Sequence, residues 1–183
     1  MAEQPLAAII LAAGQGTRMK SELHKVLHPI AGQPMLHHLL DSLEAAGAAR
    51  QVVVVGARRE QVEASVAPRG VDIAHQAEQL GTAHAALQAK DALAGFDGIA
   101  IVCFGDTPFL RPETVARLRD RLLADDAPRV AVLGFVPDDA KAYGRIVADE
   151  TGAISKMVEF KDATDEERAV KLCNSGVTAV RTA

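Results

Sequence analysis

Apolar runs of a few residues alternate with amphipathic segments along the first two thirds of this chain. Uninterrupted runs of Val, Ile, Leu and Ala are typical of parallel strands covered on both faces. The predicted strands cover residues 6–11, 51–56, 71–75, 98–104 and 129–136. The predicted helices between them cover residues 34–47, 58–66, 81–93 and 112–123. Strands that alternate with helices indicate an α/β fold with a mostly parallel sheet and right-handed crossovers.

A different pattern begins after Pro137. Two strand-like segments, residues 144–148 and 153–160, flank the turn-forming residues 149–152, which predicts a β-hairpin. The last predicted elements are a charged helix over residues 162–170 and a strand over residues 172–180. We therefore expect a mixed hairpin region near the C-terminus. No internal repeat or long linker interrupts the sequence, so residues 1–183 are expected to form one domain.

Composition excludes several classes of function. Acidic and basic residues are mixed along the chain, with a net charge of −4, so no basic stripe favours nucleic-acid binding. No apolar run is long enough to cross a membrane, and the first residues lack the pattern of a secretory leader. Cys103 and Cys173 lie in apolar runs without zinc-ligand spacing, which indicates free buried thiols. We expect a soluble, cytoplasmic protein.

The first predicted strand runs into a glycine-rich turn. Gly14 and Gly16 allow backbone angles that side chains forbid and bring N–H groups close to an anion. Arg18 and Lys25 add positive charge beyond the turn. This pattern indicates a nucleotide-phosphate site, although a tight strand-to-helix turn without a ligand has the same glycines. Met19 stands where a dinucleotide fingerprint needs its third glycine and where a P-loop needs the glycine before Lys-Ser, so neither motif is present.

Two further candidate positions follow predicted strands, where open α/β sheets bind their ligands. Asp106 comes after the buried strand 98–104 and is placed to hold a magnesium ion that bridges phosphates. The alternative is that Asp106 only caps the segment that begins at Thr107. Gly81 and Thr82 open a predicted helix, where N–H groups and the hydroxyl can hold a ligand, or simply cap the helix.

A longer stretch of the N-terminal sequence distinguishes between these alternatives. The segments LAAGQGTRM (11–19) and LHKVLHPIAGQPM (23–35) resemble the start of the sugar-nucleotide pyrophosphorylases. Within that family, they are most similar to the uridyltransferase domain of bacterial N-acetylglucosamine-1-phosphate uridyltransferases. The resemblance implies a Rossmann-like, mostly parallel twisted sheet flanked by helices, of the nucleotide-diphospho-sugar transferase type.

The resemblance also implies roles for individual residues. Arg18 and Lys25 would stabilise the triphosphate and the departing pyrophosphate, and Asp106 would bind Mg²⁺. Gln76 and the run 79–85 match the uracil-recognising segment of the family. The implied nucleotide-binding residues are Leu11, Ala12, Ala13, Gly14, Gly16, Thr17, Gln76, Gly81 and Thr82.

Three later segments match the part of the family that binds the sugar. They are YGRI (143–146), VEFKDA (158–163) and NSG (174–176). The resemblance implies that Gly144, Glu159 and Asn174 hold N-acetylglucosamine 1-phosphate. Without the resemblance, Glu159 is better explained as an ordinary solvated residue of the hairpin.

The implied activity is a magnesium-dependent transfer of UMP from UTP to N-acetylglucosamine 1-phosphate, which yields UDP-N-acetylglucosamine and pyrophosphate. The attacking phosphate oxygen is ionised at neutral pH, so no histidine is needed as a base. His37 and His38 lie in a leucine-rich helix without carboxylates or cysteines at ligand spacing, which favours packing or surface roles.

The family has further residues after those matched here. They include a second magnesium ligand, an asparagine, and usually a left-handed β-helix acetyltransferase domain. We therefore expect residues 1–183 to be C-terminally incomplete relative to the family. Two alternatives stay open: a nucleotidyltransferase with another base or acceptor, such as a molybdenum-cofactor nucleotidyltransferase, and a nucleotide-sugar binding module without turnover.

Overall fold

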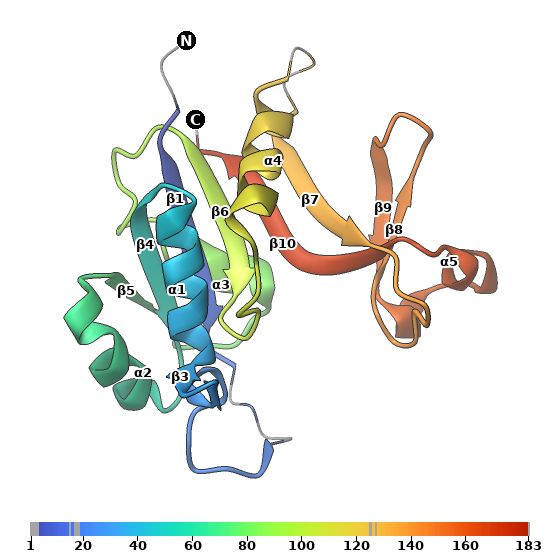
Figure 1. Cartoon of the computed structure of the whole chain (residues 1–183). Coiled ribbons are helices and arrows are strands. Elements are labelled where there is room, and N and C mark those ends of the chain that lie inside the picture. The colour runs from blue at the N-terminus through green and yellow to red at the C-terminus, as the bar shows by residue number, and fades with distance from the viewer. Residues whose placement is uncertain (1–3, 15, 17–18, 125, 127, 183) are drawn as a thin grey trace. The chain divides into compact units, whose positions relative to one another are not determined.

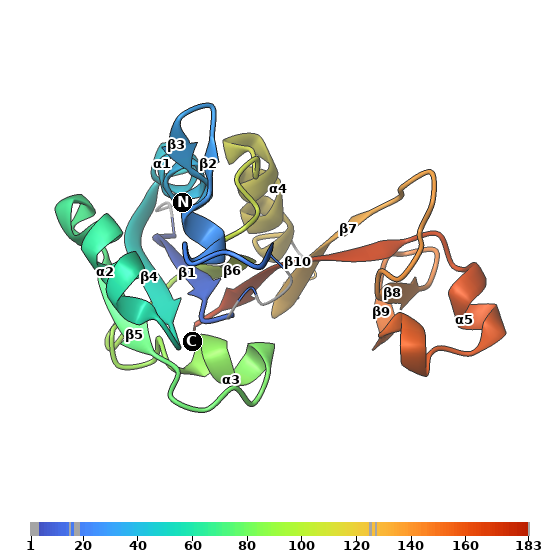
Figure 2. The same cartoon turned by 90° about the horizontal axis from the view of Figure 1, so that it is seen from below.

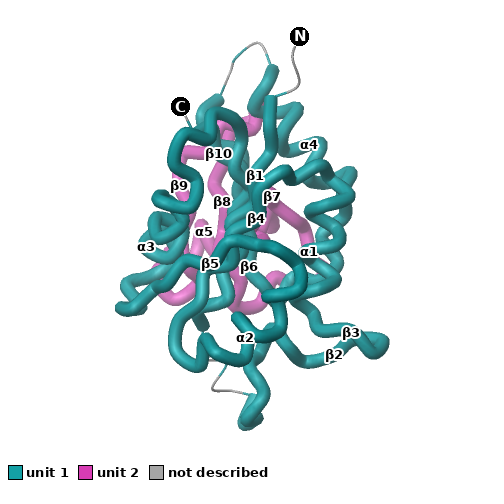
Figure 3. Tube along the Cα trace, turned by 90° about the vertical axis from the view of Figure 1, so that its left-hand side faces the viewer, with its two compact units in different colours: residues 1–131, 178–183 teal, residues 132–177 magenta. Residues whose placement is uncertain are grey.

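The computed structural model describes residues 4–14, 16, 19–124, 126 and 128–182. They form two compact units, residues 1–131 with 178–183 and residues 132–177 (Figure 3). Strands β7 (Val130–Phe135) and β10 (Cys173–Arg181) each run from one unit into the other. That the whole chain is one nucleotidyltransferase domain stays a prediction.

The larger unit is built on a sheet with a parallel core (Figure 1). Its strands follow the order β5-β4-β1-β6, with bounds Asp72–His75, Ala48–Val55, Leu6–Ala12 and Ile99–Phe104. Residues 178–181 of β10 pair antiparallel with β6, from Thr178 opposite Val102 to Arg181 opposite Ile99. The predicted α/β fold with a mostly parallel sheet is confirmed.

Strand β1 occupies the centre of this sheet. All seven of its residues are buried, and Ile10 lies opposite Val53 of β4 and Cys103 of β6. Fully burying one such aliphatic side chain stabilises the folded state by about 1.5–3 kcal/mol. The apolar run of residues 6–11 therefore fixes the strand from whose end the glycine turn begins.

Helices cover both faces of the parallel core (Figure 2). Helices α1 and α4 pack on one face and α3 on the other. The α-helices among the described residues of this unit are α1 (Met35–Ala45), α2 (Arg59–Val66), α3 (Thr82–Leu87) and α4 (Pro112–Leu122). Among the described residues, no helix is long and apolar enough to span a bilayer.

Helix α3 is shorter than the predicted 81–93. The Gln88 side-chain amide donates to the His84 carbonyl oxygen at 3.0 Å, which is the oxygen that the Gln88 backbone N–H would use in a continuing α-helix. The Gln88 backbone N–H donates to the Ala85 carbonyl oxygen instead, at 3.1 Å, and further turns with three-residue spacing follow. Periodicity alone does not predict this local competition for a carbonyl group.

The smaller unit contains the predicted hairpin, now seen as strands β8 (Arg145–Ala148) and β9 (Ile154–Val158), which pair antiparallel. Asp149 Oδ1 accepts from the backbone N–H groups of Thr151 and Ala153 and closes the turn. Helix α5 (Asp165–Ala169) is shorter than the predicted 162–170. It begins after Thr164, which forms a capping box with Glu167, while Phe160–Asp162 is a 3-10 turn.

Candidate active site

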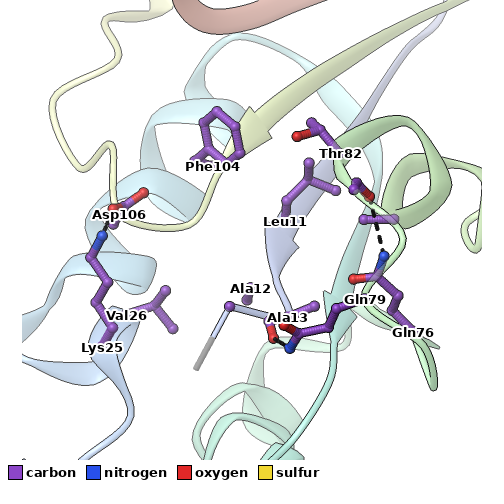
Figure 4. A pocket seen from close by; sticks show the side chains of 13 residues that line it. Leu11, Ala12, Ala13, Lys25, Val26, Gln76, Gln79, Thr82, Phe104 and Asp106 are labelled. Carbon is purple, nitrogen blue, oxygen red and sulfur yellow. Dashed lines mark hydrogen bonds and ion pairs between the residues drawn. The ribbon is translucent and has the colours of Figure 1, made fainter. Parts of the chain in front are cut away.

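A cavity of about 320 Å³ opens at the carboxyl edge of the sheet in the larger unit (Figure 4). In Figure 4, Lys25 and Asp106 lie on one side of it, Gln76 and Thr82 on the other, and the end of β1 between them. The predicted site residues that line it are Leu11, Ala12, Ala13, Gly14, Lys25, Gln76, Gly81, Thr82 and Asp106. The structure therefore brings these residues together, whereas Thr17 and Arg18 lie outside the described residues.

Two glycines let backbone segments approach closely beside this cavity. A Cβ at Gly56 would lie 2.7 Å from the Ala13 carbonyl oxygen, and a Cβ at Gly16 would lie 2.7 Å from the Lys25 Cβ. Gly16 also has a φ of +60°, which favours glycine. Gly14, in contrast, has open space beside it, because a Cβ there would meet no atom within 4 Å. Gly16 does not line the cavity itself, but it packs against Lys25, which does.

Lys25 and Asp106 form an ion pair at the mouth of the cavity. Their side chains are 41% and 29% exposed, so both groups are open to a ligand. Asp106 follows β6 in a turn in which the Thr107 hydroxyl and backbone N–H both donate to the Phe104 carbonyl oxygen. Helix α4 takes Arg111 as its N-cap. Asp106 therefore pairs with Lys25 and does not cap α4, and its role as a magnesium ligand stays a prediction.

The opposite wall presents a buried amide. Gln76 is 5% exposed, and its Nε2 donates to the Gly81 carbonyl oxygen at 3.2 Å. Because Gly81 is an acceptor there, the Gln76 carbonyl oxygen is left for another partner. Gly81 is the N-cap of α3 with a φ of 102°, and no side-chain hydrogen bond caps this helix. The Thr82 hydroxyl at the cavity wall is not used as a cap.

Sequence reasoning missed four residues that also line the cavity: Val26, Gln79, Ala85 and Phe104. Gln79 Nε2 donates to the Ala13 carbonyl oxygen at 2.9 Å and so links the wall that contains Gln76 to the end of β1. Gln79 and Ala85 could have been predicted from the sequence, because both belong to the matched run 79–85. Phe104 is the last residue of a strand whose position beside the cavity follows only from the sheet order.

The three predicted sugar-binding residues lie together in the smaller unit. The Asn174 backbone N–H donates to the Gly144 carbonyl oxygen at 2.9 Å. A Cβ at Gly144 would lie 3.6 Å from Glu159 Oε1, so this glycine leaves room beside the carboxylate. Asn174 Oδ1 accepts from the Gly176 N–H at 2.9 Å, which turns the amide nitrogen away from its own backbone. Their role in binding a sugar phosphate stays a prediction.

Arg145, which follows Gly144, is a structural residue that the motif match did not single out. It is 3% exposed, and its guanidinium donates to the carbonyl oxygens of Ala140, Lys141, Tyr143 and Arg168. The guanidinium also lies 5.5 Å from the ring centre of Phe160. A buried guanidinium is stable only when its donors are satisfied. Arg145 therefore organises the loop that precedes Gly144.

Other titratable groups contribute little reactive chemistry. Burial raises the pKa of the Cys103 thiol to about 12, so this cysteine stays protonated and unreactive. Burial, followed by the nearby charge of Arg58, lowers the pKa of His24. His37 Nε2 lies 2.9 Å from the Ser65 hydroxyl, and His38 Nε2 lies 2.8 Å from the Ile30 carbonyl oxygen. These two histidines make hydrogen bonds within the fold.

The donor set of the cavity suits a magnesium ion shared with a substrate. No group of three His, Cys, Asp or Glu side chains is gathered for a metal in the part of the chain that the structure describes. Mg²⁺ is, however, commonly held by one or two carboxylates together with water and substrate phosphates. The single, partly exposed carboxylate of Asp106 fits such a shared site.

A solved structure shares the fold of this chain. UDP-glucose pyrophosphorylase, solved with UDP-glucose, superposes with a TM-score of 0.75 at 18% identity, over 97% of this chain and 76% of its own. At this identity the likeness shows the fold alone. The predicted Rossmann-like sheet is therefore confirmed.

The sequence comparisons identify the family. The profile of the MobA-like NTP transferase domain matches residues 8–158, and the chain belongs to this family. It is also similar to the bifunctional protein GlmU of Rhizorhabdus wittichii, with 62% identity over 181 residues, and of Novosphingobium aromaticivorans, with 55% over 181 residues. These matches cover 99% of this chain, which spans about 40% of the length of either relative.

Proposed function

We propose that this chain is a magnesium-dependent uridylyltransferase, which makes UDP-N-acetylglucosamine and pyrophosphate from UTP and N-acetylglucosamine 1-phosphate. The observation that carries the proposal is the cavity in which a buried amide faces an exposed lysine–aspartate pair across the end of β1. The similarity to GlmU over nearly the whole chain supports the choice of substrates.

Recognition of the base would fall to Gln76. Its Nε2 donates to the Gly81 carbonyl oxygen, so its own carbonyl oxygen would accept a hydrogen bond from a ligand. Uracil offers an N–H donor at N3, whereas cytosine has an acceptor at this position. A fixed acceptor in a buried wall discriminates against the wrong base because it would leave polar groups unpaired.

Charge neutralisation would fall to the other wall. A phosphate oxygen of the sugar phosphate attacks the α-phosphorus of UTP, and the bond to the bridging oxygen of the β-phosphate breaks to release pyrophosphate. The Lys25 ammonium would stabilise the negative charge that develops on pyrophosphate. Gly14 and Gly16 would offer backbone N–H groups to the phosphates, with Arg18 as a second cation. Because these groups act by position and charge, no general base is needed.

Asp106 would hold Mg²⁺ through its carboxylate, and the ion would draw charge from the phosphates during transfer. In the smaller unit, Gly144, Glu159 and Asn174 would bind N-acetylglucosamine 1-phosphate. The mutual proximity of these three residues supports this assignment. Location in the cytoplasm is part of the proposal, because the substrates are those of cytoplasmic nucleotide-sugar synthesis.

A panel of nucleotides tests the proposal. Pyrophosphate release would be measured with UTP, CTP, GTP, ATP and dTTP, each with N-acetylglucosamine 1-phosphate and Mg²⁺. The proposal predicts release with UTP well above the others. Release with another nucleotide would indicate a different member of the MobA-like family. Binding of UDP-N-acetylglucosamine without any release would indicate a binding module and refute the enzymatic function.

A further inference from the structure

The segment that leads to Lys25 is held by helix α2, and one side chain makes most of the connection. Gln61 Oε1 accepts from the backbone N–H of His24 at 2.7 Å, and Gln61 Nε2 donates to the carbonyl oxygen of Glu22 at 3.0 Å. Both halves of one amide therefore bind the backbone directly before Lys25. Oε1 is an acceptor and Nε2 is a donor, so the two backbone partners fix the orientation of the amide.

A second side chain at the start of the same helix supports this contact. Arg58 is the N-cap of α2, and its Nη1 donates to the carbonyl oxygen of Ser21 at 3.2 Å. Arg58 has a φ of 62°, in the left-handed region that a non-glycine residue adopts at a cost. Such a conformation persists where the surroundings determine it, as the contact to the loop does here.

The segment has no regular secondary structure to fix its path. Residues 20–24 form no helix or strand, so their position depends on tertiary contacts. His24 is 1% exposed, but neither of its ring nitrogens has a hydrogen-bond partner among the described residues. The polar contacts that orient the segment are therefore those of its backbone, and Gln61 supplies two of them.

We propose that Gln61 is a positioning residue for Lys25, acting through the backbone of Glu22 and His24. The inference rests on the proposed function, because it requires Lys25 to act on the phosphates. Without the amide, the segment has more freedom and the Lys25 ammonium spends less time beside Asp106 and the cavity. A displacement of about 1 Å of a reacting group can reduce turnover by up to about a hundredfold, so we expect Gln61→Ala to lose about tenfold or more in kcat.

The test is a double-mutant cycle with pyrophosphate release as the assay. Wild type, Gln61→Ala, Lys25→Ala and the double variant are compared at saturating UTP, N-acetylglucosamine 1-phosphate and Mg²⁺. If Gln61 acts through Lys25, its replacement lowers kcat in the wild-type chain and has no further effect once Lys25 is absent. A role in general stability would instead lower kcat by the same factor in both backgrounds.

Two variants on the same helix serve as controls. Glu60→Ala removes an exposed side chain that forms an ion pair with Arg59, and it should leave kcat unchanged. Gln61→Glu keeps an acceptor for the His24 N–H but loses the donor to Glu22, and its kcat should fall between those of wild type and Gln61→Ala. Gln61 is exposed in a helix, where alanine is well tolerated, so these variants are expected to fold.

Hydrogen exchange at the His24 and Lys25 amides provides a readout that does not depend on turnover. Gln61→Ala should speed exchange at His24, and Glu60→Ala should not. Unchanged exchange, or an equal loss of kcat in both backgrounds of the cycle, would overturn the positioning role. A wild-type chain that releases no pyrophosphate from any nucleotide would refute the proposed function, and exchange would still decide whether Gln61 fixes the segment.

Discussion

Replacing Gly16 with alanine tests the packing of the glycine turn against Lys25. A φ of +60° costs a non-glycine residue about 1–2 kcal/mol. The new Cβ would lie 2.7 Å from the Lys25 Cβ, which is well inside ordinary van der Waals contact. Overpacking of this kind costs about 1–3 kcal/mol. Together the two effects predict that Gly16→Ala lowers the free energy of unfolding by about 2–5 kcal/mol.

This cost is expected to appear in global unfolding. Lys25 begins the 3-10 turn Lys25–Leu27, in which Val26 and Leu27 are buried, so displacing Lys25 disturbs the core. Gly14→Ala is the matched control, because its Cβ would meet nothing within 4 Å and its φ is not positive. Urea denaturation of both variants gives the comparison. Unfolding free energies within about 0.5 kcal/mol of each other would show that the turn does not pack against Lys25 in this way.

Three further predictions concern the site, the pH dependence and the smaller unit. Asp106→Ala should change the unfolding free energy by less than about 1 kcal/mol, because its ion pair is partly exposed, yet abolish most turnover; a stable, fully active variant would contradict this. The pKa of His24 is lower in the folded chain than in the unfolded chain, so at acid pH the unfolded chain binds a proton that the folded chain does not. The free energy of unfolding therefore falls as the pH drops through about 6.5 and below. His24→Leu should make that fall shallower in urea titrations at several pH values, and an unchanged slope would argue against it. Thr164→Ala removes the capping box with Glu167 and should destabilise α5 by about 1 kcal/mol. Limited proteolysis should then cut α5 faster in Thr164→Ala than in Thr164→Ser, which keeps a capping hydroxyl, and equal rates would contradict the role of the cap.

Hydrophobic patterning predicted the strands of this fold because their burial is local in sequence. The buried run 6–11 became β1 with one added residue, Ala12. Strand β4 begins at Ala48, earlier than the predicted 51, because Ala48 pairs with Leu6 and continues the parallel ladder. Arg50 lies within that extension, and a charged residue gives no apolar signal. Pairing partners, which lie far apart in sequence, therefore set the ends that patterning could not.

The candidate site was predictable where residues follow strands. Gly14 and Asp106 reach one cavity because β1 and β6 are neighbours and run parallel, so their carboxyl ends meet at the same edge. The ion pair between Lys25 and Asp106 could not be read from the sequence, because it depends on the path of the loop before Lys25. Gln61 was missed for the same reason: periodicity places it on the exposed side of a helix, and only the tertiary structure gives it two backbone partners.

The most direct test of the proposed function is pyrophosphate release by the purified chain from UTP, N-acetylglucosamine 1-phosphate and Mg²⁺. The Lys25→Ala and Asp106→Ala variants are measured under the same conditions. We predict release that requires all three components and that falls by at least about a hundredfold in each variant while both remain folded. Release at the wild-type rate from folded variants would contradict the assignment of chemistry to this cavity, and no release from the wild-type chain would contradict the function itself.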